Sequence, residues 1–166
     1  VTFYTYNQMK YYIYVIIDLL ALRAVSWKIS KKNSTQIIRK TFMQAYSSRE
    51  ITVNLLFHSD QDSNLTSKTF MNQSEKLNLE QSFSKPGRPY DNSVCESFFS
   101  SLKQEELYRH EYKTVEDIKR NINNYMIFYN EKRLYSVLRY WTPNKFEAKF
   151  YDKLRISQES IRTSLV

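Results

Sequence analysis

The chain passes from strand-forming into helix-forming sequence within one stretch, residues 84–107, which reads SKPGRPYDNSVCESFFSSLKQEEL. It contains the only glycine of the chain and two of its three prolines, which indicate a turn, and it continues as an amphipathic helix. Early in that helix Glu96 lies between Val94 and Phe98, so we expect it in an apolar neighbourhood. Such an acid is either a first-turn partner of the helix dipole or a rigidly held functional carboxylate.

The spacing of residues in this helix separates two faces. Val94, Phe98 and Leu102 recur at i, i+4 and i+8 and form a core stripe. A second, polar face carries Asn92, Glu96, Ser100 and Lys103. Lys103, two turns beyond Glu96, could bind a phosphate that lies against the site. The same residue is equally typical of an ordinary solvated helix face.

The remaining segments predict an α/β fold. Upstream we expect strands at 1–6, 11–19 and 24–30 with a hairpin connection at 7–10, a helix after caps at 33–35, a strand at 51–58, a helix from Thr66 and a strand at 79–83. Downstream, a helical pattern runs for nearly forty residues from Asn92 with a break near Tyr112, Thr142 and Pro143 cap a last short helix, and a loosely ordered tail follows Tyr151. Residues 1–150 then form one domain, a mixed sheet with helices on both faces.

The composition excludes several classes of protein. A hydrophobic fraction of 42% with 16% aromatic residues excludes a disordered chain. A single cysteine excludes a disulfide scaffold and a thiolate zinc site. The longest apolar run, residues 11–22, is interrupted by Asp18 and is too short to span a bilayer, and no export signal is recognisable. We therefore expect a soluble cytoplasmic protein with no membrane partner.

The charge is positive and unevenly distributed. Lysine and arginine number 25 against 17 acidic residues, for a net charge of +8. Between residues 19 and 49 there are seven basic residues and no acidic one. This distribution favours a polyanionic partner, most often nucleic acid, although a solvated basic face without a partner would have the same composition.

Two acids stand where chemistry collects in α/β folds. Asp60 follows the expected strand at 51–58, and Glu96 lies 36 positions later on the helix. Carboxylates that converge from a strand end and a helix can bind a divalent cation such as Mg²⁺, which prefers oxygen ligands. The alternative is that Asp60 caps the following turn or helix and Glu96 complements the helix dipole.

Three stretches resemble a known family. They are HSDQDSNLTSKTF (58–70), SFSKPGRPYDNSVCESFFSSLKQEELYRH (82–110) and FYNEKRLYSVLRYWTPNKFE (128–147). They are similar to the catalytic domain of DDE-type insertion-sequence transposases, in the group whose transposase is split over two reading frames, and to its second-frame product. Retroviral integrases are more distant relatives.

The resemblance implies a ribonuclease-H-like fold with a mixed five-stranded sheet, and a triad of two aspartates and a glutamate that binds Mg²⁺ or Mn²⁺. The family cleaves a DNA strand with water and then joins the freed 3′-hydroxyl to target DNA. Asp60 matches the second acid and Glu96 the third. Lys103 matches a lysine that lies against the DNA end, and Asn92 belongs to the same motif.

Further contacts are implied by the same resemblance. Lys85, Arg88 and Tyr90 lie in a turn that faces DNA in relatives. The implied partners are the DNA ends of an element and its target, further copies of the chain, and a subunit from an upstream reading frame that supplies the DNA-end-binding domain. The implied location is the nucleoid of a bacterial cytoplasm.

The first acid of the triad has no match. The family's opening strand resembles T-D-I-T-Y, whereas this chain begins VTFYTY, with Phe3 at the aspartate position. Phenylalanine cannot coordinate a metal, and we expect its ring in the metal cavity and the activity lost or severely impaired. Asp18 and Asp62 are the candidate substitute ligands. The alternative function is a non-catalytic transposase remnant that binds DNA or intact transposase.

Overall fold

The computed structural model describes residues 1–49, 51, 54–84 and 92–163 of the chain, with side chains through residue 157. The strands are β1 (Thr2–Tyr6), β2 (Met9–Asp18), β3 (Arg23–Ser30), β4 (Leu56–Ser59) and β5 (Glu80–Phe83). The helices are α1 (Thr35–Ser47), α2 (Lys68–Lys76), α3 (Ser93–Leu102), α4 (Val115–Glu131) and α5 (Pro143–Thr163), with a π-helical turn η2 (Lys103–Leu107) and a 3₁₀ turn η3 (Ser136–Leu138).

The first three strands, which the sequence predicts, form an antiparallel meander. In the β1–β2 hairpin Phe3 lies opposite Tyr12 and Tyr6 opposite Met9. Asn7 and Gln8 have φ values of 47° and 61°, the left-handed conformation of a two-residue hairpin turn. The connection is therefore shorter than the expected 7–10.

The five predicted strands are present, but their hydrogen bonds do not join them into one sheet. Over the described residues β1, β2 and β3 form one sheet, and β4 and β5 form a separate parallel pair. The strand expected at 51–58 is extended and paired only from Leu56 to Ser59, and residues 52–53 lie outside the described residues. The expectation of one continuous sheet is thus wrong for the described residues, in which no backbone pairing joins the two sheets.

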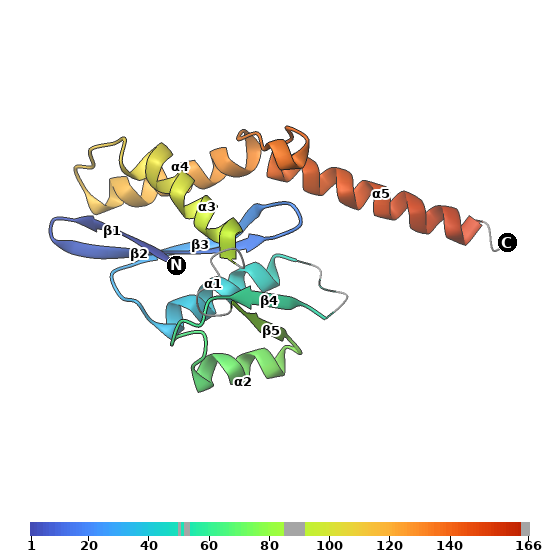
Figure 1. Cartoon of the computed structure of the whole chain (residues 1–166), viewed down its shortest axis with the longest axis horizontal. Helices are drawn as coiled ribbons and strands as arrows, with labels where there is room; N and C mark the ends of the chain where they lie inside the picture. The colour runs from blue at the N-terminus through green and yellow to red at the C-terminus, as the bar shows by residue number, and fades with distance from the viewer. Residues whose placement is uncertain (50, 52–53, 85–91, 164–166) are drawn as a thin grey trace.

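Helices cover both faces of the meander (Figure 1). On one face, α3 and α4 form a core with β2 and β3 that includes Ile13, Ala24, Phe98, Leu102, Ile118, Ile122 and Met126. On the other face, α1 and α2 pack with Tyr14 in a second core of Ile38, Phe42, Leu65 and Phe70, against which Phe57 of β4 packs. This second core joins the β4–β5 pair to the meander in the absence of backbone pairing between the two sheets in the described residues.

The last helix is longer than expected. We predicted a short helix and irregular chain after about Tyr151, whereas α5 continues to Thr163 and projects away from the two cores (Figure 1). The reason is local, because no glycine or proline follows Pro143 to end the helix. No described helix, α5 included, is both long and apolar enough to cross a membrane.

Candidate active site

Glu96 lies in the first turn of α3, on the polar face that the sequence predicts. Phe98 and Leu102 are buried at 1% and 0% exposure and hold the opposite face of α3 against the first core. Glu96 itself is exposed, so the expected apolar neighbourhood is wrong. Phe98, two positions further along the helix, points into the core while Glu96 points out of it, because these positions lie on different faces of the helix.

Asp60 follows directly after β4, at the carboxyl end of the parallel β4–β5 pair. Ser59 is buried and Asp60 is exposed. The imidazole of His58 lies 3.1 Å from the hydroxyl oxygens of both Ser82 and Ser84, which ties the end of β4 to the end of β5. Asp60 therefore extends from a fixed strand end, the position at which open α/β sheets bind ligands.

The alternative role of Asp60 as a cap is wrong. The N-cap of α2 is Ser67, whose hydroxyl accepts a hydrogen bond from the Phe70 amide at 3.4 Å. The turn before it is closed by Asp62, whose carboxylate accepts from the Asn64 amide at 2.8 Å. Within the described residues neither Asp60 nor Glu96 forms a side-chain hydrogen bond or ion pair, so both carboxylates remain available to a ligand.

Cys95 is acted on electrostatically by both Asp60 and Glu96. Its thiol is half-buried, and burial raises its pKa; the N-terminal ammonium lowers the pKa in part, while the negative charges of Asp60 and Glu96 raise it. Both acids are therefore close enough to act electrostatically on one sulfur atom, although they come from separate elements. The raised pKa keeps Cys95 protonated at neutral pH.

The alignment predicts that the Phe3 ring lies in the metal cavity, but the ring is not enclosed. Its ring is 45% exposed and contacts the neighbouring strand, with the Tyr12 ring at 6.2 Å between centroids and the Lys10 ammonium 4.5 Å from its centroid. No group of three His, Cys, Asp or Glu side chains in the described residues could hold a metal ion.

The fold and these residues match one family. Residues 1–89 match the integrase core domain, and residues 77–143 match a second integrase core domain description. The chain belongs to the integrase core domain family. The predicted resemblance to insertion-sequence transposases and integrases is thereby confirmed.

Curated relatives of this integrase core are transposases of insertion sequences. It is 32% identical over 137 residues to the transposase of element IS904 from Lactococcus lactis, covering 82% of this chain and 54% of the relative. It is 27% identical over 151 residues to the putative transposase InsK of element IS150 from Escherichia coli, covering 91% of this chain and 53% of the relative. The chain thus spans about half the length of the curated relatives it matches.

Solved structures confirm the ribonuclease-H-like fold. The HTLV-2 integrase catalytic core domain in complex with magnesium aligns with a TM-score of 0.67 at 17% identity, over 87% of this chain and 90% of that chain. The BIV integrase catalytic core domain aligns with a TM-score of 0.67 at 18% identity, over 92% of this chain and 95% of that chain.

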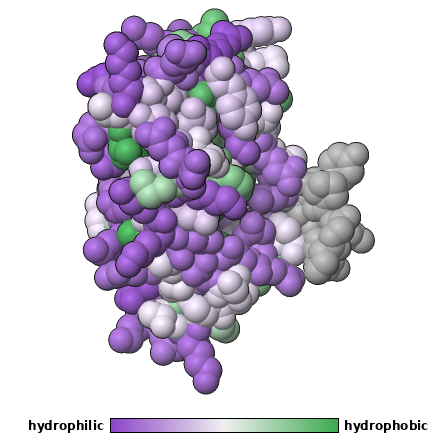
Figure 2. All heavy atoms as spheres, turned by 90° about the vertical axis from the view of Figure 1, so that its left-hand side faces the viewer, coloured by the Kyte–Doolittle hydropathy of each residue, from purple (hydrophilic) through white to green (hydrophobic). Residues whose placement is uncertain are grey.

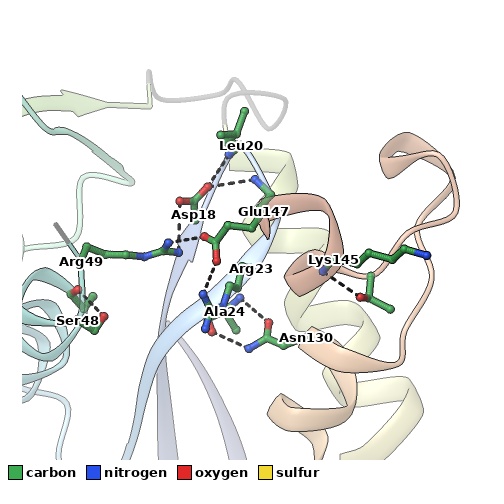
Figure 3. A network of polar contacts seen from close by, with 12 residues as sticks. Asp18, Leu20, Arg23, Ala24, Ser48, Arg49, Asn130, Lys145 and Glu147 are labelled. Atoms are coloured by element: carbon green, nitrogen blue, oxygen red, sulfur yellow. Dashed lines mark hydrogen bonds and ion pairs between the residues drawn. The ribbon is translucent and has the colours of Figure 1, made fainter. Parts of the chain in front are cut away.

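The two candidate substitute acids of this integrase core are bound to other partners. Asp18 accepts hydrogen bonds from the Leu20 and Ala21 amides at 2.8 and 3.1 Å, and its second oxygen lies 3.5 Å from the Arg49 guanidinium (Figure 3). Asp62 is held by Asn64, whose backbone and side-chain amides both donate to it. Both oxygens of Asp18 are thus engaged, whereas both Asn64 contacts are to a single oxygen of Asp62.

The network around Asp18 fastens α5 to the end of the meander. Glu147 of α5 is buried at 7% exposure and accepts from both Arg23 and Arg49 (Figure 3). Beside it, the Asn130 side chain of α4 accepts from the Ala24 amide at 3.0 Å and donates to the Ala24 carbonyl at 2.9 Å. These contacts occupy the outer edge of β3 and hold both helices there.

Lys103 stands at the point where α3 changes into the π-helical turn η2, and it is half-buried.

Glu105, two residues after Lys103, is bound by the guanidinium of Arg133 at 2.7 to 3.1 Å and by the Tyr125 hydroxyl at 3.0 Å. Arg133 also donates to the Ser101 hydroxyl and lies 4.4 Å from the Tyr135 ring centroid. Sequence reasoning missed this clamp, although Glu105 and Arg133 belong to the quoted family stretches.

The other predicted DNA contacts divide into two groups. Asn92 is the N-cap residue of α3, is half-buried and makes no side-chain cap hydrogen bond, so its amide is not used to start the helix. Lys85, Arg88 and Tyr90 lie in residues 85–91, outside the described residues. Their roles stay predictions.

Proposed function

We propose that residues 1–150 are a transposase catalytic core that acts on DNA and whose strand-cleavage and strand-transfer activity is severely impaired. The observation that carries this proposal is a combination of residues: Asp60 and Glu96, which both act electrostatically on Cys95 and make no side-chain hydrogen bond or ion pair within the described residues, and a phenylalanine at the position of the family's first aspartate. The family membership supplies the reaction class.

The two carboxylates fit one hard divalent cation. Mg²⁺ is commonly held by one or two protein carboxylates, with water and substrate phosphate oxygens completing its shell. Asp60 and Glu96 would hold Mg²⁺ or Mn²⁺, which when bound stabilises negative charge on a phosphoryl oxygen. Two carboxylates are too few for the two-ion site that retains both the attacking and the leaving oxygen.

The missing ligand decides the rate. Metal-ion stabilisation of transition-state charge contributes several kcal/mol, and each 1.4 kcal/mol corresponds to about tenfold in rate. Loss of part of that stabilisation at position 3 reduces the rate by orders of magnitude. Substitution by Asp18 or Asp62 is opposed by the hydrogen bonds in which both are engaged.

The charge supports DNA as the partner. The first 49 residues contain eight basic residues and only Asp18 as an acid. The end of the molecule that carries the β1–β2 turn presents mainly hydrophilic side chains with hydrophobic ones between them (Figure 2). We assign phosphate contacts to Lys103, Asn92, Lys85 and Arg88, with Tyr90 beside them.

A second candidate function is a non-catalytic module that binds DNA or intact transposase subunits, including further copies of this chain and an upstream-frame product. Phe3 favours this second function, because phenylalanine in place of the family's aspartate removes a metal ligand without removing any basic residue. Either function would place the chain at the nucleoid of a bacterial cytoplasm.

A strand-transfer assay in Mn²⁺ tests the impairment. The wild-type chain should join DNA ends no better than the Glu96→Gln variant, because both lack a complete triad. Efficient joining by the wild type that Glu96→Gln abolishes would overturn the proposal. Mn²⁺ binding that depends on Asp60 and Glu96 supports the catalytic core, whereas its absence supports the binding module.

A further inference from the structure

Phe3 lies on an open part of the meander. Along β1 the side chains alternate, and Tyr4 and Tyr6 pack against the core beneath α3 and α4. Phe3 therefore faces the opposite side of the sheet, the side on which α1 packs against β2 and β3. There α1 leaves the Phe3 ring 45% exposed.

The neighbours of Phe3 are an aromatic ring and a cation. The Tyr12 ring is tilted by 56° to it at 6.2 Å, and the Lys10 ammonium lies 4.5 Å from its centroid. We call Phe3, Lys10 and Tyr12 the Phe3 platform. An aromatic ring beside a cation, with an acid-free sequence from residue 1 to residue 17, complements a base attached to a phosphate.

We propose that the Phe3 platform binds an unpaired nucleotide base by stacking, with Lys10 on its phosphate. This inference rests on the proposed function, because it assigns a contact for single-stranded DNA within a DNA-binding core. The exchange of the family's aspartate for phenylalanine would thus replace a metal ligand by a base contact.

Base stacking on the Phe3 ring is stronger than the cation–π contact of Lys10 with that ring, so a base can displace the Lys10 ammonium from it. An exposed cation–π contact is worth roughly two- to fivefold in affinity, whereas stacking of one base on an aromatic side chain is worth roughly five- to 150-fold. The displaced ammonium stays attached to β2, where the phosphate of the same nucleotide can pair with it. A duplex end with all bases paired cannot make this contact.

The test compares single-stranded and duplex DNA by fluorescence anisotropy at one salt concentration, with a labelled oligothymidylate and a blunt duplex of equal length. Phe3→Ala and Phe3→Leu should weaken oligothymidylate binding about tenfold and change duplex binding less than about twofold. Phe3→Leu keeps an apolar side chain without a π face, so it separates stacking from loss of structure. Phe128→Ala removes a ring of similar exposure, 43%, on α4 and should change neither affinity.

A spectroscopic readout completes the test. A fluorescent adenine analogue placed in the strand should lose emission on binding the wild type and not on binding Phe3→Leu. Unchanged oligothymidylate affinity in both Phe3 variants, with duplex binding by the wild type intact, would overturn the stacking proposal alone. A wild-type chain that binds neither DNA would overturn the proposed function as well.

Discussion

At the scale of the residue, position 3 determines which chemistry β1 can contribute. A carboxylate there would lie beside Lys10 and could bind a cation, whereas the phenyl ring can only pack or stack. The role of Asp60 and Glu96 as metal ligands stays a prediction, but their places, after β4 and on α3, could be predicted from the sequence. The contacts of Phe3 could not, because Lys10 and Tyr12 reach it through the pairing of β1 with β2.

Cys95 provides a residue-scale prediction. Because burial and the two nearby carboxylates raise its thiol pKa, the thiolate is scarce at neutral pH and becomes populated only above the usual value of 9.0. Alkylation by iodoacetamide should therefore be several-fold slower in the folded chain than in the urea-unfolded chain, and its rate should still rise above pH 9.0. Equal rates in the two states, measured by mass spectrometry, would contradict the placement of Cys95.

At the scale of the element, the chain shows which features sequence patterns can predict. The β1–β2 hairpin follows from its β-branched and aromatic residues, and the start of α1 follows from Ser34 at its N-cap position, although the Ser34 side chain makes no cap hydrogen bond. Sequence patterns did not predict the division of the five described strands into two sheets or the length of α5. Pairing between strands that are distant in the sequence depends on their tertiary arrangement, and α5 continues because no glycine or proline in its sequence ends it.

The clamp between η2 and the end of α4 provides the second prediction. Arg133 binds Glu105 with two nitrogens and stacks near Tyr135, which lysine cannot reproduce. Arg133→Lys should lower the free energy of unfolding by about 1–3 kcal/mol in urea titrations. The control Arg120→Lys, in an exposed pair with Asp117, should lower it by less than about 0.5 kcal/mol. Equal effects of the two variants would exclude the clamp.

The same clamp has a pH dependence. Burial alone would raise the pKa of Glu105, but hydrogen bonds from Arg133 and Tyr125 outweigh it and hold the pKa below its usual value. A depressed pKa stabilises the fold at pH above the unfolded value near 4.5, and this contribution is lost as pH falls through the folded value. Between about pH 7 and about pH 3 the wild type should therefore lose more stability than Glu105→Gln. An equal loss in both chains would contradict this assignment.

At the scale of the whole molecule, two cores and one polar network hold the layers together. The network connects α5 to the meander through Glu147, a buried carboxylate between two arginines. Removing its charge leaves Arg23 and Arg49 without their shared partner. Glu147→Gln should therefore lower the free energy of unfolding by about 3–5 kcal/mol.

Urea unfolding measured by circular dichroism checks this prediction, with Glu116→Gln as control. Glu116 is 77% exposed and pairs with Lys119 on the surface of α4, so its substitution should cost less than about 1 kcal/mol. A Glu147→Gln variant as stable as the control would show that α5 is held by apolar packing alone.

Calorimetric titration of Mn²⁺ into the wild type and the Phe3→Asp variant tests the central claim most directly, with circular dichroism confirming that both are folded. Restoring the family's first carboxylate should tighten Mn²⁺ binding by about tenfold or more, and Glu96→Gln in the Phe3→Asp background should remove that gain. Wild-type binding as tight as that of Phe3→Asp would contradict the account, because it would mean that Phe3 does not replace a metal ligand.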